Sequence, residues 1–414
     1  MSRMPPAFQH RDFRVFWFGA LFSAAGTQMT TVAMAWQIYE LTGSAFQVGL
    51  LGLGRAIPQI GFAVFGGLIA DAMDRKRLMI VLQVMQCGVS AALALLTLTG
   101  AISPGVLFVC AVLFAFSSAM ETPIRQAVVP NLVPRGDLGS AVALSTMERS
   151  LGLIVGPAIA GVMIAVSGPA LCYAADATSW LIMLASLALI RGPLQVSITG
   201  RVSLQALAAG LRFVSRQPVI LPFMILDFGA TLFGSSYALL PIYAKDILDV
   251  GPVGLGALYA APSAGGVIMG VALSGPLRID RAGRWVLFGV AFYGLCTMAF
   301  AVSTVLWVSV LALAGAGAGN IVSAVLRGTS NQLLTPDELR GRVAAVNSAF
   351  VTGGPQLGQF ESGVVAAAVG TQISALTGGI GALALAGGMW LLPRVRAFRL
   401  SSVTAQAPEG SLRN

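Results

Sequence analysis

Ionisable side chains occur inside long apolar stretches of this chain, where a site that binds a solute or transfers a proton would need them. A charged group is costly in a hydrocarbon environment, so each is expected to face a cavity or an oppositely charged partner. These residues are Arg55, Glu121, Arg125, Glu148, Arg149, Asp227 and Glu361, with Asp176 a weaker case near the end of its stretch.

The spacing of these residues suggests roles. Glu121 and Arg125 are one helical turn apart and are expected to pair. Asp227 has no basic residue within one turn, which ranks it first as a group that could take up a proton. The predicted proton-coupling residues are therefore Asp227, Glu121 and Glu148, and the predicted contacts for anionic substrate groups are Arg55, Arg125 and Arg149. A structural ion pair is the alternative for each.

Other kinds of chemistry find little support. The single histidine, His10, lies in the N-terminal tail, and the four cysteines all lie in apolar stretches without a metal-binding spacing. No nucleophile–base pair and no nucleotide-binding loop can be recognised. We therefore expect no metal, no cofactor and no enzymatic activity. The net charge of +9 does not suggest nucleic acid, because the basic residues form short clusters between apolar stretches.

Composition points to a membrane. Hydrophobic residues make up 56% of the 414 and charged residues only 10%, which is too few to coat a water-facing surface. An all-α integral membrane protein with twelve transmembrane helices in two bundles of six is predicted. The expected spans are 14–38, 47–70, 78–99, 105–128, 140–166, 170–190, 218–241, 253–275, 285–303, 305–328, 341–366 and 371–392.

The segments between and after the spans set the domain boundaries. Leu204, Leu207, Leu211 and Val214 recur at helical spacing in the polar segment between the two groups, which predicts an amphipathic helix on the membrane surface. A plain solvated linker is the alternative. The expected parts are an N-terminal bundle 1–191, a cytoplasmic linker 192–217, a C-terminal bundle 218–393 and a disordered cytoplasmic tail 394–414.

Basic residues predict the orientation. If the N-terminus is cytoplasmic, the inner loops contain clusters such as 75–77 and 278–284, and the outer loops contain only Lys245. Since positive loops stay inside, both termini are expected in the cytoplasm, and the bacterial inner membrane is the expected location.

The two halves of the chain resemble each other. Gly67-x3-Asp71 after the second span has a counterpart after the eighth, in the segment 275–284. The sequence 130–138 after the fourth span matches 332–339 after the tenth, and Gly156-Pro157 in the fifth matches Gly354-Pro355 in the eleventh. Three correspondences in the same order predict two parallel six-helix repeats.

On these motifs the chain resembles the major facilitator superfamily. Within it, 123–127, 258–261 and 335–342 are similar to the branch of drug:proton antiporters that holds enterobactin exporters and macrolide-efflux proteins. The resemblance implies a conformational latch formed by Asp71, Arg75 and Lys76 in the loop between the second and third helices. It also implies that Gly152, Gly156, Pro157 and Gly161 form the fifth-helix motif associated with antiporters, whose small residues allow another helix to approach closely.

The resemblance implies a secondary active transporter that exports a small amphipathic molecule, such as an enterobactin-like siderophore, in exchange for protons. A multidrug or macrolide efflux pump is the alternative, and a non-transporting membrane scaffold is the alternative from another class. The expected partners are a small-molecule substrate, protons and membrane lipid, without nucleic acid; a monomer suffices for this mechanism.

Overall fold

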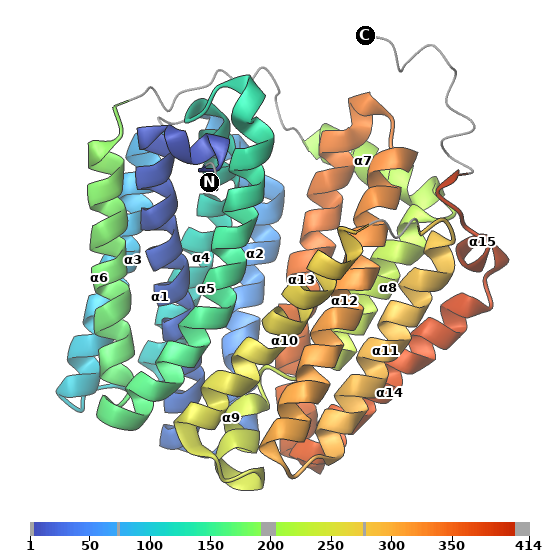
Figure 1. The fold of residues 1–414 in the computed structure, drawn as a ribbon. Helices are drawn as coiled ribbons and strands as arrows, with labels where there is room; N and C mark the ends of the chain where they lie inside the picture. Colours follow the sequence, from blue (N-terminus) through green and yellow to red (C-terminus); the bar gives the residue numbers. More distant parts are fainter. Residues whose placement is uncertain (1–3, 73–74, 192–203, 276–278, 402–414) are drawn as a thin grey trace. The chain divides into compact units, whose positions relative to one another are not determined.

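The computed structural model describes residues 4–72, 75–191, 204–275 and 279–401, with the backbone alone for 62–72, 75 and 204–207. The described residues form helices joined by short connections (Figure 1). The chain divides into two compact units, Met1–Val202 with Leu240–Ala260 and Ser203–Leu239 with Ala261–Asn414. The contact-based division therefore assigns 240–260 to the first unit, whereas the sequence placed this segment in the second bundle.

Helices lie in all the expected spans, but the seventh, expected at 218–241, is interrupted, because its helix ends at Gly234. In the first unit they are α1 (Arg11–Thr42), α2 (Ala45–Ala72), α3 (Arg75–Leu98), α4 (Pro104–Val128), α5 (Leu138–Ser167) and α6 (Pro169–Leu189). The later helices are α8 (Ile220–Gly234), α10 (Gly251–Leu273), α11 (Ala282–Val302), α12 (Leu306–Leu334), α13 (Arg340–Val369) and α14 (Thr371–Trp390). Between α8 and α10 lie the short helix α9 (Leu240–Ile242) and a π-helical turn at Tyr243–Ile247.

The helices are consistent with a membrane protein of many spans. Among the described residues, 8 helices are long and apolar enough to cross a membrane, or 9 if the bent pair Ala208–Arg216 and Ile220–Gly234 counts as one span. The first bundle has many large apolar side chains on its surface, among them Phe18 and Phe22 of α1. Lipid solvates such a surface, whereas water does not.

The two units repeat the same helix pairings. In the first, α1 packs on α5 and α6, and α3 packs on α6; in the second, α8 packs on α13 and α14, and α11 packs on α14. The helices α5 and α13 have 30 residues each, and the glycines that follow them, Gly168 and Gly370, both have a positive φ. Glycine adopts this conformation without the steric cost of a Cβ, so the same sharp connection leads into α6 and α14.

The amphipathic segment forms α7 (Leu204–Arg216), and Val214 of its apolar face packs against protein, whereas Leu211 is exposed. Val214 is buried in a cluster with Ile220, Met224, Val343 and Val346. Gly210 lies so close to α13 that an added Cβ would be 3.0 Å from the Cβ of Arg342. The expected helix is therefore present, and it contacts α13 of its own unit through Gly210 and Val214.

The chain after α14 is docked as far as Ser401, so the expectation of disorder from residue 394 is wrong for 394–401. A short helix α15 (Pro393–Arg396) follows α14, and Val395 and Phe398 are buried among α8, α11 and α14 residues. The backbone amides of Leu400 and Ser401 donate to the carbonyl (2.9 Å) and the Oδ1 atom (3.0 Å) of Asp280. Residues 402–414 lie outside the described part.

Acid should release this C-terminal segment. Hydrogen bonds from the side chain and backbone amide of Ser401 lower the pKa of Asp280, because they favour the charged carboxylate. Because the pKa of Asp280 is lower in the docked form than its free value of about 3.9, the ionised carboxylate stabilises docking at pH values above about 3.9. This stabilisation is lost as the pH falls through the lowered pKa. The protection of the amides in 398–401 against hydrogen exchange, relative to the intrinsic rate at each pH, should therefore fall below about pH 4. In Asp280→Asn the exchange should be fast at neutral pH; an unchanged acid response in that variant would contradict the assignment.

Candidate functional site

A buried network surrounds Arg125 in the first unit. Its Nε donates to Glu121 Oε1 at 2.7 Å one turn earlier in α4, which confirms the predicted pair. A terminal nitrogen donates to Ser23 Oγ of α1 at 2.7 Å, and the other lies 3.9 Å from Glu148 Oε1 of α5. Gln86 of α3 donates to the second oxygen of Glu121 at 3.1 Å. Three helices thus meet at one guanidinium, and α3 joins the network through Glu121.

The network contains more acid than base. Glu121 and Glu148 are both buried and both face Arg125; the adjacent Arg149 is exposed and acts on Glu148 only from outside this cluster. Fully ionised, the group carries one excess negative charge, which a low-dielectric interior disfavours. A proton shared between the two carboxylates would remove the excess charge, so the cluster can exchange a proton without losing its ion pair.

The second unit contains a balanced pair. Arg327 of α12 donates to Asp227 of α8 and, at 2.8 Å, to Ser323 Oγ on its own helix. Both charged residues are buried. The sequence analysis ranked Asp227 first among the proton-coupling candidates because no basic residue lies near it in the chain. This reason is wrong, because Arg327, a hundred positions away, reaches Asp227 from another helix.

Arg327 was missed by the sequence analysis, although the repeat contains a signal for it. Arg327 precedes Pro336 by the same number of residues as Arg125 precedes Pro134. When the two halves are aligned on these arginines, Ser323 matches Glu121. Each of these two residues accepts a hydrogen bond from the arginine one turn later on its own helix. The repeat therefore places one buried arginine in each unit and changes the residues that accept its hydrogen bonds.

Asp176 of α6 was the weaker candidate, yet it is fully buried. Its Oδ2 accepts from Thr30 of α1 at 2.8 Å and from Ser90 of α3 at 2.7 Å, and Ser179 Oγ lies 3.4 Å from Oδ1. No ion pair to it is found among the described residues. Asp176 is thus a buried carboxyl group surrounded by hydroxyls.

The other predicted residues are scattered. Arg55 of α2 is half-buried, with a terminal nitrogen 3.8 Å from Met34 Sδ, and Glu361 of α13 is also half-buried. Lys76 of the proposed latch donates to the carbonyl of Ile190 at 3.4 Å, at the end of α6. The side chains of Asp71 and Arg75 lie outside the described part of the structure, so the latch stays a prediction.

The fifth-helix glycines allow close packing, as predicted. An added Cβ at Gly152 would lie 2.8 Å from the Cβ of Ala24, and one at Gly156 would lie 2.6 Å from the carbonyl oxygen of Ala25, both in α1. At Gly161 the nearest atom is the carbonyl oxygen of Pro252, 2.6 Å away, at the start of α10. Two helices therefore approach α5 where it has no side chain.

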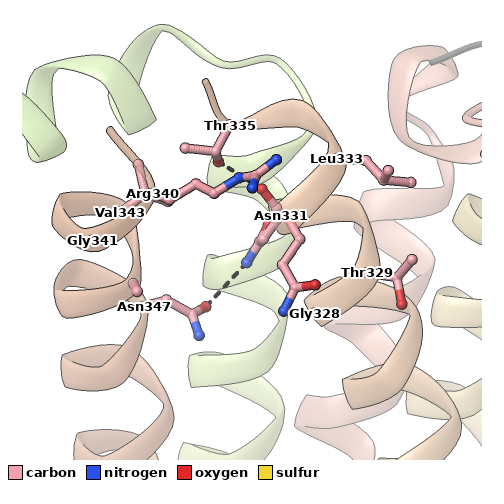
Figure 2. A pocket seen from close by; sticks show the side chains of 11 residues that line it. Gly328, Thr329, Asn331, Leu333, Thr335, Arg340, Gly341, Val343 and Asn347 are labelled. Atoms are coloured by element: carbon pink, nitrogen blue, oxygen red, sulfur yellow. Dashed lines mark hydrogen bonds between the residues drawn. The ribbon is translucent and has the colours of Figure 1, made fainter. Parts of the chain in front are cut away.

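A polar pocket of about 700 Å³ lies between α12 and α13 in the second unit. Figure 2 shows the carboxamides of Asn331 and Asn347 meeting there, at 3.2 Å, with Arg340 above them. Arg340 also pairs with the exposed Asp337 at 2.9 Å. The Oδ1 atom of Asn331 is buried and has no partner among the described residues. The pocket has the size and polarity to hold part of a small molecule.

Solved structures identify the class of fold. A bacterial homolog of the human lysosomal transporter Spinster aligns with a TM-score of 0.74 at 14% identity, covering 95% of this chain and 98% of that one. A POT family transporter in complex with 5-aminolevulinic acid aligns with a TM-score of 0.76 at 13% identity, covering 93% and 96%. At these identities the likeness establishes the fold, which is that of major facilitator transporters.

The sequence places the chain more narrowly. A family model described as transmembrane secretion effector matches residues 2–411, so the chain belongs to that family of multi-pass membrane transporters. The multidrug efflux pump Tap of Mycolicibacterium fortuitum is 27% identical over 398 residues, which cover 93% of this chain and 96% of Tap. The enterobactin exporter EntS of Escherichia coli O157:H7 is 28% identical over 412 residues, covering 97% and 96%. The resemblance inferred from the motifs is confirmed.

Substitutions at Gly156 should disturb the packing of α5 on α1. An alanine Cβ would already lie too close to the backbone of Ala25, so Gly156→Ala is no mild change, and Gly156→Leu is worse. Overpacking of this kind costs about 1–3 kcal/mol. We expect a lower melting temperature and reduced transport for both variants. Gly139→Ala, on the same helix but facing open space, is the control and should behave as wild type. Wild-type behaviour of Gly156→Leu would disprove the close contact.

The Asp227–Arg327 pair should stabilise the second unit. Removing one partner leaves a buried charge without compensation, which costs about 3–5 kcal/mol. Asp227→Asn should therefore lower the melting temperature in lipid, and Asp227→Asn combined with Arg327→Gln should recover part of the loss. Equal melting temperatures for the single variant and the wild type would exclude a structural pair, and would leave proton coupling as the role to test for Asp227.

Proposed function

We propose that this protein is a proton-coupled exporter of a small amphipathic molecule in a bacterial inner membrane. The observation that carries the proposal is the Arg125 network, in a chain of the transmembrane secretion effector family. A gradient-driven exporter needs a buried group that gains and loses a proton in each cycle. Two carboxylates that share one guanidinium meet that need at a small electrostatic cost.

The proposal assigns different roles to the two charged clusters. In the first unit, Glu121 and Glu148 hold the exchangeable proton while Arg125 keeps the cluster near neutrality. In the second, Asp227 is neutralised by Arg327 and has less reason to take up a proton. This reverses the order of candidates derived from sequence spacing. Arg55 and Arg149 remain proposed contacts for anionic groups of the substrate.

We further propose twelve spans with both termini in the cytoplasm, supported by the long helices and by the nearly exclusive placement of basic loops on one side. Asp71, Arg75 and Lys76 then lie at the cytoplasmic end of the first unit, where the proposed latch would act. Transport would proceed by alternating exposure of a site near the membrane midplane.

The relatives suggest two kinds of substrate. EntS exports enterobactin and Tap is a multidrug pump, and the identities to the two are nearly equal. We favour a siderophore-like molecule, with drug-like compounds as the second candidate. Uptake of enterobactin and of ethidium into inverted membrane vesicles, driven by a proton gradient, separates these candidates. Uptake of neither would favour the scaffold alternative.

Glu148 supplies the test of proton coupling. Glu148→Gln removes the excess acid and leaves a neutral Arg125–Glu121 pair, so the fold should survive while gradient-driven flux falls by about tenfold or more, the effect of losing a required ionisable group. Exchange of labelled for unlabelled substrate without a gradient should persist. Thr146→Val is the control, since this exposed hydroxyl of α5 donates to its own helix at Val142. Undiminished gradient-driven flux in Glu148→Gln would refute the role of the network.

A further inference from the structure

A line of buried polar side chains runs along the seam between α1, α3 and α6 of the first unit. In α1 the residues are Ser23, Thr30 and Gln37, which recur every seven positions and so lie on one face of the helix. Their partners lie on the other two helices or in the Arg125 network. This seam is the interior of a transmembrane bundle, where polar groups are expensive unless they serve a purpose.

The centre of the line is Asp176. Hydroxyls from all three helices surround it, namely Thr30, Ser90 and Ser179, all of them buried. The thiols of Cys87 of α3 and Cys172 of α6 also lie near it. No countercharge to Asp176 is found in the part of the chain that the structure describes. A carboxyl group in such an interior favours its neutral form, and hydroxyls can both donate to it and accept from it.

The line continues away from the Arg125 network towards the far end of the bundle. One turn from Asp176, Tyr173 donates to Gln37 Oε1 at 2.8 Å, and Gln37 Nε2 donates to Thr97 Oγ1 at 3.1 Å. These side chains again come from α6, α1 and α3, in that order. The same three helices thus supply two polar layers. One surrounds Asp176, and the other, formed by Tyr173, Gln37 and Thr97, is the Gln37 layer.

In the other direction the line reaches the Arg125 network. Ser90 and Gln86 are one turn apart on α3, a rise of about 6 Å, and Gln86 donates to Glu121. Ser117 on α4 lies one turn from Glu121, and its buried hydroxyl has no partner among the described residues; the same holds for the carboxamide of Gln83, one turn from Gln86 on the side away from Ser90. Buried polar groups of this kind ordinarily bind water, which can bridge gaps of one turn.

The second unit does not repeat the line. At the offset that relates α6 to α14, Asp176 corresponds to Gly378, Tyr173 to Ala375 and Ser179 to Gly381. Polar groups needed only to hold such a bundle together would be expected in both repeats. The α14 seam instead packs through glycine, as an added Cβ at Gly381 would lie 3.0 Å from the ring of Phe233.

From this asymmetry we propose that the α1–α3–α6 seam conducts protons between the Gln37 layer and the Arg125 network, with Asp176 as the relay. The inference rests on the proposed proton coupling and adds the route. The protonated Asp176 passes its proton along hydroxyls and bound water to a carboxylate of the network. The Asp176 carboxylate then takes up a proton that arrives from water at the Gln37 layer, so Asp176 returns to its protonated starting state and no other reactant is consumed.

The first test asks whether Asp176 is protonated, and it needs no substrate. Infrared difference spectra of the full-length protein in lipid, recorded between acidic and alkaline pH, should contain a carboxylic-acid carbonyl band that is absent in Asp176→Asn. The band should shift in Ser90→Ala, which removes one hydrogen bond to the carboxyl group. Asp227→Asn should keep the band, because Asp227 is paired with Arg327. Identical spectra for Asp176→Asn and wild type would overturn the proposal.

The second test asks whether the line carries the proton that drives transport. Gln37→Leu and Asp176→Asn should slow gradient-driven uptake of ethidium or enterobactin, whichever the wild type moves, by about tenfold, as for loss of an intramembrane relay group. Exchange without a gradient should be unchanged. Ser186→Ala is the matched control, since this buried α6 hydroxyl donates only within its own helix, to Ile182.

The outcomes separate the route from the function. Full gradient-driven uptake in Asp176→Asn and Gln37→Leu would overturn the route and leave the proposed function intact. An equal loss in Ser186→Ala would also overturn it, because the effect would then be one of packing. If the wild type moves neither probe with the gradient, the proposed function fails, and the infrared band alone decides whether Asp176 takes up a proton.

Discussion

The burial of charge in a hydrocarbon environment is the constraint on which the rest of this structure depends. Arg125 satisfies it by drawing Glu121, Glu148 and Ser23 to one guanidinium, which ties α1, α4 and α5 together. The strip of small residues on α5 allows the helix packing that this arrangement needs. Gly152 and Gly156 bring the backbones of α5 and α1 close enough for side chains one or two turns away to reach the same arginine.

Duplication explains why the two units resemble each other and why they differ. Arg125 and Arg327 occupy matching positions, and each bonds a residue one turn earlier and a residue from the first long helix of its unit. The acid is on the arginine's own helix in the first unit and on the neighbouring helix in the second. Glu148 has no acidic counterpart at the matching Phe350, so the excess of acid around the arginine is not repeated in the second unit.

The spans, the repeat and the small-residue strip of α5 could be predicted from the sequence because each depends on local composition or spacing. The pair Glu121–Arg125 belongs with them, since one helical turn separates its members. Asp227–Arg327 could not be found by spacing, because packing brings together residues of different helices; only the repeat pointed to Arg327. Asp176 was undervalued for the same reason, as its partners Thr30 and Ser90 are hydroxyls far away in the chain.

The placement of the polar line within one unit matters for the proposed alternating-access cycle, in which the two bundles would move against each other. A proton route that crossed a moving boundary would have to break and re-form its hydrogen bonds in every cycle. The helices α1, α3 and α6 all belong to the first unit, and so do Glu121 and Glu148. A relay through Asp176 would therefore keep its hydrogen bonds while the bundles move. Proton coupling would then be controlled by the exposure of the Arg125 network, and not by the formation of the proton route.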